Sequence, residues 1–137
     1  MRNNHARSFV TIMMAIALSA FVLRFAIERL IKLGIARNES EALGALKLIS
    51  ASLENYALDN RGAYPVSLIA LTKTKPPYLE KEYVKPSLLK GYNFSCGRLE
   101  PSGYSCSAVP IACRLTGKTS YSVSTGNLLL SEECDKK

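Results

Sequence analysis

Four cysteines are the side chains of this sequence best suited to specific chemistry, and all of them lie in its last third: Cys96, Cys106, Cys113 and Cys134. Four thiols can form two disulfides in an oxidising compartment or can bind zinc. Zinc sites usually combine closely spaced Cys and His pairs, whereas these cysteines are ten, seven and twenty-one positions apart with no histidine nearby. We therefore predict two disulfides, and four cysteines allow three ways of pairing.

Catalytic and metal-binding groups are otherwise sparse in this sequence. The single histidine, His5, lies in the N-terminal tail, and Cys113 has no base close to it in sequence. Glu132, Glu133 and Asp135 could offer oxygen ligands to calcium, but they lack the spacing and the turn glycine of a calcium loop, so a solvated tail is the better interpretation. We expect a protein that is not an enzyme and that needs no cofactor.

The basic charge of the chain is diffuse. The formal net charge is +7, with lysines spread along a proline-rich stretch that also contains Tyr78, Tyr83 and Tyr92. Tyrosines among lysines can stack on single-stranded nucleic acid. We expect these rings instead to cover the rim of the folded domain, and so we predict no specific nucleic-acid partner.

The N-terminal region has the composition of a membrane-spanning helix. A short basic segment, 1–8, is followed by an apolar run from Phe9 to Ile27 whose only charged residue is Arg24. About twenty helical residues cover the roughly 30 Å of a bilayer core. A cleaved signal peptide would have a shorter apolar core, so we predict a retained helix that spans the membrane over residues 9–27.

The helix is expected to continue through residues 28–60 with one apolar face. Its stripe has a near-heptad spacing and comprises Leu43, Leu46, Ile49, Leu53 and Tyr56. Gly34 and Gly44 are expected to be bends, and Asn60-Arg61-Gly62 is a stop signal.

Residues 61–137 are expected to form a small extracytoplasmic domain with a β-meander. One short helix is expected at 66–71. Strands are then expected at 91–96, 103–109 and 119–123, where the residue types alternate, and at the apolar run 128–130. The sequence thus predicts an α+β fold in which the amphipathic helix packs against three or four antiparallel strands. If the first hairpin turns near Pro101, Cys96 faces Cys106, and Cys113 is left to pair with Cys134.

The charges flanking the apolar run give conflicting indications of orientation. Arg24, Arg29, Lys32 and Arg37 follow the run, and by the positive-inside rule they would place the C-terminal domain in the cytoplasm. Spacings of four residues pair Arg24 and Lys32 with Glu28, and the cysteines favour an oxidising compartment. We therefore expect a single-pass protein with a cytoplasmic N-terminus and a periplasmic or extracellular domain.

Several segments resemble a type IV pilin or a type II secretion pseudopilin, most specifically Leu53-Glu54-Asn55-Tyr56 followed by Asp59-Asn60-Arg61-Gly62-Ala63-Tyr64-Pro65. The resemblance implies processing before Phe9 by a prepilin peptidase and methylation of Phe9. Ser8 stands where that family has glycine, and Met13 stands where it has a glutamate that pairs with a neighbouring subunit. The sequence thus departs from the family pattern at the two positions that govern cleavage and subunit pairing.

The resemblance implies a structural subunit in the bacterial inner membrane that assembles with other pilin-like subunits. Its filament would be a type IV pilus or a type II secretion pseudopilus, with a minor, tip or initiating role suggested by Met13. The alternative is a permanently membrane-anchored extracytoplasmic binding module that does not polymerise.

Overall fold

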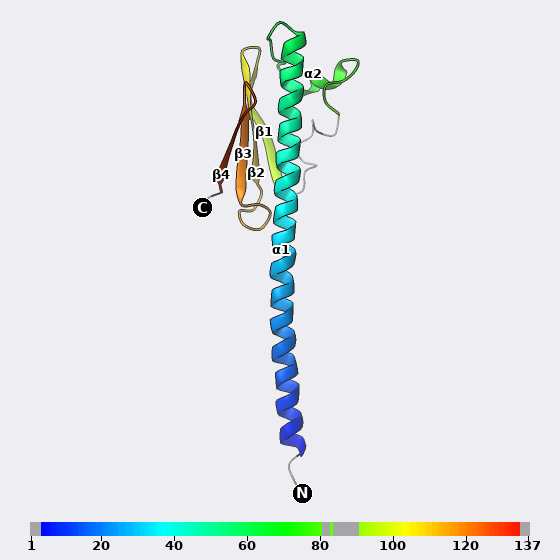
Figure 1. Ribbon diagram of the computed structural model, residues 1–137, viewed down its shortest axis with the longest axis vertical. Helices are drawn as coiled ribbons and strands as arrows, with labels where there is room; N and C mark the ends of the chain where they lie inside the picture. The colour runs from blue at the N-terminus through cyan, green and yellow to red at the C-terminus, as the bar shows by residue number, and fades with distance from the viewer. Residues whose placement is uncertain (1–3, 81–82, 84–90, 135–137) are drawn as a thin grey trace. The chain divides into compact units, whose positions relative to one another are not determined.

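The computed structural model describes residues 4–80, 83 and 91–134, and within them it has two helices and four strands. The helices are α1 (Asn4–Asp59) and α2 (Leu68–Lys73), and the strands are β1 (Tyr92–Glu100), β2 (Gly103–Pro110), β3 (Thr119–Ser124) and β4 (Leu128–Glu133) (Figure 1). The chain divides into two compact units, Met1–Gly34 and Ile35–Lys137. The predicted fold class, a long helix with a four-stranded antiparallel sheet, is confirmed.

Helix α1 is longer at its start than the sequence predicted. It already includes Asn4, inside the segment expected to precede the helix, and no glycine or proline before Phe9 would prevent this. Gly34 and Gly44 do not interrupt the helix, because each costs only about 1 kcal/mol relative to alanine and both are flanked by good helix formers. The helix ends where Gly62, with φ 83°, donates its N–H to the Ala57 carbonyl at 2.7 Å.

Helix α2 is a short helix that follows α1 and precedes the strands in the chain. It begins two residues later than predicted because the Ser67 hydroxyl accepts the Ile69 N–H at 3.2 Å and caps its first turn. Leu71 is its buried residue, and the Leu71 carbonyl accepts the N–H of Tyr78 at 2.9 Å. This bond holds the following proline-containing loop against the helix.

The sheet is a meander in which each strand pairs with the next one in sequence. The strand order is β1-β2-β3-β4, all antiparallel, with Cys96 directly opposite Cys106 and a register shift between Cys96 and Arg98. Strand β4 extends further than predicted, because Glu132 and Glu133 pair with β3 instead of forming a solvated tail. The glutamates are nevertheless exposed, as is every residue of β4.

One face of α1 and one face of the sheet share the hydrophobic core of the unit Ile35–Lys137. The buried residues of this core are Ala42, Leu46, Ile49, Leu53, Leu71, Leu79, Tyr92, Tyr104, Cys106, Ala108 and Val123. The predicted stripe is right at its centre, where Leu46, Ile49 and Leu53 are at most 3% exposed.

The edges of the predicted stripe differ from the structure. Tyr56 is half-buried and packs against the core, while Leu43 is half-buried and lies outside the core cluster. At 100° per residue, Leu43 points roughly 90° from the centre of the buried arc, and Ala42 takes the central place. The prediction from near-heptad spacing therefore named Leu43 as the first contact of the helix with the core, whereas that contact is made by Ala42.

Candidate functional site: the uncovered helix and the braced head

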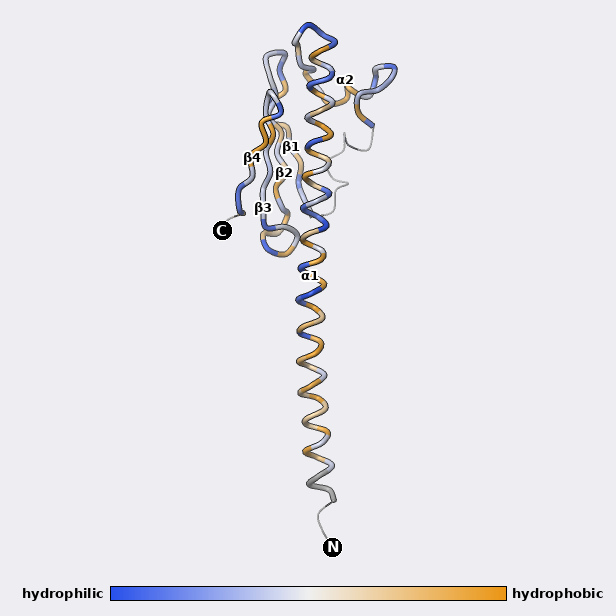
Figure 2. Tube along the Cα trace, in the orientation of Figure 1, coloured by the Kyte–Doolittle hydropathy of each residue, from blue (hydrophilic) through white to orange (hydrophobic). Residues whose placement is uncertain are grey.

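The first half of α1 carries apolar side chains on every side, and no residue that the structure describes in the same unit covers them. It contains one stretch long and apolar enough to cross a membrane, and Figure 2 shows it as a nearly unbroken hydrophobic run. Its large exposed apolar residues between Phe9 and Ile27 are Phe9, Val10, Ile12, Met13, Met14, Ile16, Leu18, Phe21, Val22, Leu23, Phe25 and Ile27. An apolar surface of this extent requires a partner other than water.

A polar side chain inside this run is satisfied locally. The Ser19 hydroxyl donates to the Ile16 carbonyl at 2.8 Å. Such a bond within the helix lets a hydroxyl lie in an apolar environment without an unpaired donor. The run is therefore compatible with lipid or with the helices of other subunits.

The predicted processing residues lie on regular helix. Ser8, Phe9 and Met13 are all helical and exposed, with Phe9 at 64% and Met13 at 54%. Phe9 and Met13 are four residues apart, so they lie on one face of α1. This face presents the ring of Phe9 and the thioether of Met13. In the family that the sequence resembles, a carboxylate stands in place of the thioether.

The globular unit, which we call the head (residues 35–134), is closed by two disulfides. Cys96 bonds Cys106 across β1 and β2, and Cys113 bonds Cys134 between the β2–β3 connection and the end of β4. The first pair is the one expected from the strand register, and the second is the one that was left by exclusion. They leave none of the four cysteines free, so the chain has no thiol for metal binding or nucleophilic chemistry.

Glu54 on α1 is the central polar contact between the helix and the sheet. Its Oε1 accepts the Tyr104 hydroxyl at 2.9 Å and the Gly126 N–H at 2.8 Å, and its Oε2 accepts the Tyr64 hydroxyl at 2.9 Å. One carboxylate thus joins the helix to β2, to the β3–β4 turn and to the loop after α1. Such charge-assisted hydrogen bonds are stronger than those between neutral groups.

The pKa values of these groups follow from their contacts. Burial alone would raise the pKa of the Glu54 carboxyl, but the hydrogen bonds from Tyr104, Tyr64 and the turn at Gly126 outweigh burial and hold its pKa below the usual range. Burial raises the pKa of Tyr104 to about 12, and the adjoining Glu54 carboxylate also acts in this direction. Glu54 is therefore charged and Tyr104 neutral across the physiological range.

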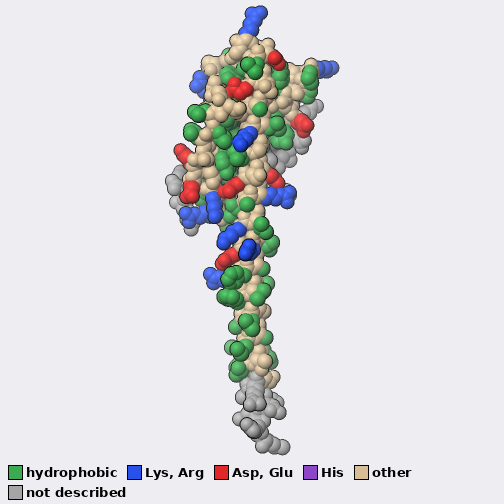
Figure 3. All heavy atoms as spheres, viewed as in Figure 1, with side chains coloured by type: hydrophobic (Ala, Val, Ile, Leu, Met, Phe, Trp, Pro, Cys, Tyr) green, Lys and Arg blue, Asp and Glu red, His purple; other side chains and the backbone are tan. Residues whose placement is uncertain are grey.

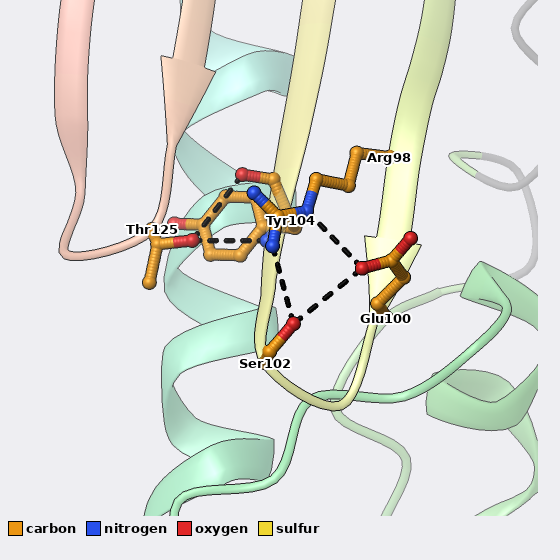
Figure 4. Close-up of polar contacts among 5 residues, drawn as sticks. All are labelled: Arg98, Glu100, Ser102, Tyr104 and Thr125. Carbon is orange, nitrogen blue, oxygen red and sulfur yellow. Dashed lines mark hydrogen bonds and ion pairs between the residues drawn. The ribbon is translucent and has the colours of Figure 1, made fainter.

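We call the hydrogen bonds of Glu54 with Tyr104, Tyr64 and Gly126 the first brace. Ser50 and Thr125 add further hydrogen bonds to Tyr104 next to it. The buried Ser50 hydroxyl lies 2.8 Å from the Tyr104 hydroxyl and also contacts the side-chain oxygen of Asn127. The Thr125 hydroxyl accepts the Tyr104 N–H at 2.9 Å (Figure 4). The same view shows Arg98, Glu100 and Ser102 in contact around the β1–β2 turn.

A second brace holds the β2–β3 connection against α1. The Asn38 side-chain amide donates to the Thr116 carbonyl at 2.9 Å, and the Glu39 carboxylate accepts the Lys118 N–H at 2.8 Å. The Tyr92 hydroxyl donates to the Thr119 carbonyl at 2.7 Å, and its ring lies directly against Gly117. The two braces together fix both ends of the sheet to one helix.

Of the three tyrosines expected to cover the rim of the folded domain, Tyr78 and Tyr83 are half-buried, and the expectation is wrong for Tyr92. Tyr92 is buried in the core, and the Tyr78 ring packs edge-on against Tyr56 with its hydroxyl bonded to Asp59. Tyr83 is half-buried against the core. The three rings thus contribute to packing instead of presenting their faces together.

The calcium ligands considered from the sequence are only partly described. Glu132 and Glu133 are exposed on β4, and Asp135 lies outside the described residues. Among the residues that are described, no three His, Cys, Asp or Glu side chains lie close enough together to hold a metal ion.

The fold and its contacts define a class of protein with a long N-terminal helix. The start of this helix is apolar and uncovered, and its later half packs against a disulfide-bonded β-meander. No family model and no curated protein matches the chain. Among solved structures it is similar to the non-core minor pilin PilV of Neisseria meningitidis, at 14% identity and a TM-score of 0.42, over 80% of this chain and 93% of that one. We draw no functional argument from so distant a likeness.

The amino-acid sequence alone did not indicate the residues of either brace. Glu54 and Asn38 look like ordinary surface positions of an amphipathic helix, and their partners follow them by 50 and 78 residues. The signal that could have found Glu54 is its position beside the stripe residue Leu53, where a carboxylate reaches the rim of the buried face.

Proposed function

We propose that this chain is a pilin-like structural subunit that spans a membrane through the first half of α1 and assembles with other such subunits. The observation that carries the proposal is the uncovered run from Phe9 to Ile27, apolar on all sides. Lipid solvates this run in the stored subunit, and helices of neighbouring subunits replace the lipid in a filament. The heads would then form the outside of the filament.

The membrane of the proposal is the bacterial inner membrane, with the N-terminus in the cytoplasm and the head in the periplasm. The two disulfides support this orientation, because they form and persist in oxidising compartments. The filament would be a type IV pilus or a type II secretion pseudopilus. The proposal assigns the chain no catalytic activity and no cofactor, since helix packing and subunit exchange need neither.

Met13 sets the role that we propose within the filament. A carboxylate in an apolar helix is costly unless a partner charge meets it, and in the resembling family that partner is a neighbouring subunit's amino terminus. A thioether makes no such contact, so this subunit would not recruit a predecessor by charge. A minor, tip or initiating subunit has the least need of that contact.

The alternative function is a permanently anchored binding module. Ser8 favours it, because the glycine of the resembling family is absent at the cleavage position. In that case α1 is only a tether, and the segment 1–8 stays on the mature chain.

The intact mass of the protein purified from its own membrane, with its N-terminus sequenced, distinguishes the two functions. The pilin function predicts a chain that begins at methylated Phe9 and retains both disulfides. A mature chain that still begins at Met1, and that is absent from sheared filaments, would favour the tether.

A further inference from the structure

Arg29 and Lys32 are cations on α1 just beyond its apolar run, and neither forms an ion pair with any residue that the structure describes. They are three residues apart, so they are neighbours on one face of the helix. Of the two ion pairs expected for Glu28, the structure shows the one with Arg24, at 3.5 Å, and not the one with Lys32. Figure 3 shows Lys and Arg side chains gathering along α1 where its apolar section ends.

An open surface hollow of about 370 Å³ is bordered by both cations. Its lining consists of Phe25, Glu28, Arg29, Lys32 and Leu33, all within the unit Met1–Gly34. Two positive side chains and two large apolar ones therefore border the same hollow. The carboxylate of Glu28 is engaged with Arg24, which reduces its repulsion of an anion.

We propose that this hollow binds an anionic phospholipid of the leaflet in which α1 leaves the membrane. Arg29 and Lys32 contact the headgroup phosphate, and Phe25 lies along the first part of an acyl chain. This inference rests on the proposed membrane span. A phospholipid is favoured over free phosphate because Phe25, on the membrane side of Arg29, offers an apolar contact that only a lipid can use.

The depth of the site agrees with this ligand. The run from Phe9 to Ile27 extends about 30 Å as a helix and fills the hydrocarbon core, so Arg29 comes to the level of the headgroups. Arginine and lysine at this level place their charged ends among the phosphates while their stems stay in the apolar region. By the positive-inside rule, the positive charges after the span conflict with the expected orientation. In this proposal two of them, Arg29 and Lys32, bind lipid.

The test uses the full chain reconstituted in phosphatidylcholine vesicles that contain spin-labelled phospholipids. The fraction of motionally restricted lipid at the protein surface is measured for labelled phosphatidylglycerol and for labelled phosphatidylcholine. Because each cation near an anionic headgroup strengthens binding by about fivefold, we expect a preference for phosphatidylglycerol between about fivefold, from one cation, and about 25-fold, from both. Arg29→Gln with Lys32→Gln should reduce the preference to about one.

A matched control removes the same charge elsewhere. Lys73→Gln with Lys75→Gln changes two exposed lysines of the head and should leave the preference intact. Inorganic phosphate added at constant ionic strength should not compete, and competition would overturn the choice of a lipid. Restricted lipid that shows no preference for phosphatidylglycerol would overturn the lipid site but not the membrane span. The same would follow if the preference fell equally in the Arg29/Lys32 and Lys73/Lys75 double variants. Absence of restricted lipid around the wild-type chain would instead overturn the membrane span.

Discussion

The Tyr104 hydroxyl on β2 donates a 2.9 Å hydrogen bond to the carboxylate of Glu54 on α1, across fifty positions of sequence. The same carboxylate accepts bonds from Tyr64 and from the backbone of Gly126. The attachment of the sheet to the helix thus depends on one charged side chain as well as on the apolar core. This relationship makes the head sensitive to a change at a single half-exposed position.

Glu54→Gln should destabilise the head by about 1–2 kcal/mol. The substitution keeps the shape of the side chain but replaces one acceptor oxygen by an amide donor, so at least one partner loses its bond, while partial exposure limits the cost. Urea unfolding of the full chain in detergent, followed by near-UV circular dichroism of the tyrosines, measures the loss.

The control for this prediction is Glu41→Gln. Among the described residues, Glu41 accepts only from the exposed Arg37, at 2.8 Å on the same helix, and its loss should cost no more than about 0.5 kcal/mol. Equal effects of the two substitutions would show that Glu54 does not brace the head.

The stability of the head should fall in acid because of Glu54. Its folded pKa is below the unfolded value of about 4.3, so the unfolded chain takes up the proton first as the pH drops. The contribution is fully present above the unfolded pKa and is lost as the pH falls through the folded pKa. Unfolding curves of the wild type and Glu54→Gln, measured from pH 7 down to about 3, should therefore converge at the acid end; a constant gap would contradict this account.

Gly117→Ala should destabilise the head by about 1–3 kcal/mol through steric conflict. A Cβ at this position would lie 2.6 Å from the Cζ of Tyr92, a ring buried in the core and bonded to Thr119. Gly97→Ala is the matched control, since a Cβ there would meet no atom within 4 Å. Thermal unfolding of both variants measures the difference, and a Gly117 variant as stable as the control would refute the close packing.

Removal of either disulfide should destabilise the head by about 3 kcal/mol, with the larger loss for the Cys113–Cys134 pair. That pair closes a loop of 21 residues, whereas Cys96–Cys106 closes one of 10, and a longer loop gains more freedom when opened. The measurement is urea unfolding of the two double serine variants. Wild-type stability in either variant would contradict the prediction.

The fold could be predicted from the sequence where the signals are local. The sequence shows where helical spacing gives way to the alternation of strands, and the equal distances of Cys96 and Cys106 from Pro101 predict that they face each other. The structure pairs these two residues, but its turn lies between Glu100 and Gly103 because the register shifts between Cys96 and Arg98. The burial of Leu46 and Leu53 follows from helical spacing alone. These features need no knowledge of distant neighbours.

The braces could not be predicted because their partners are distant in sequence. A carboxylate at position 54 is equally suited to solvent until the sheet places Tyr104 and Gly126 against it. Gly117 likewise has no special meaning until Tyr92 packs on it. Leu43 was misplaced for a related reason, since only the position of the sheet shows which edge of a wide apolar arc is covered.

The central claim, that the uncovered half of α1 packs against other subunits, is tested most directly by photo-crosslinking from Phe21. A photoreactive phenylalanine analogue at this exposed position should give a ladder of crosslinked multimers in sheared filaments and none from dilute detergent-solubilised protein. The same analogue at Phe94, half-buried in the head, should crosslink only within one chain. Monomers alone from the Phe21 variant in intact filaments would contradict the account.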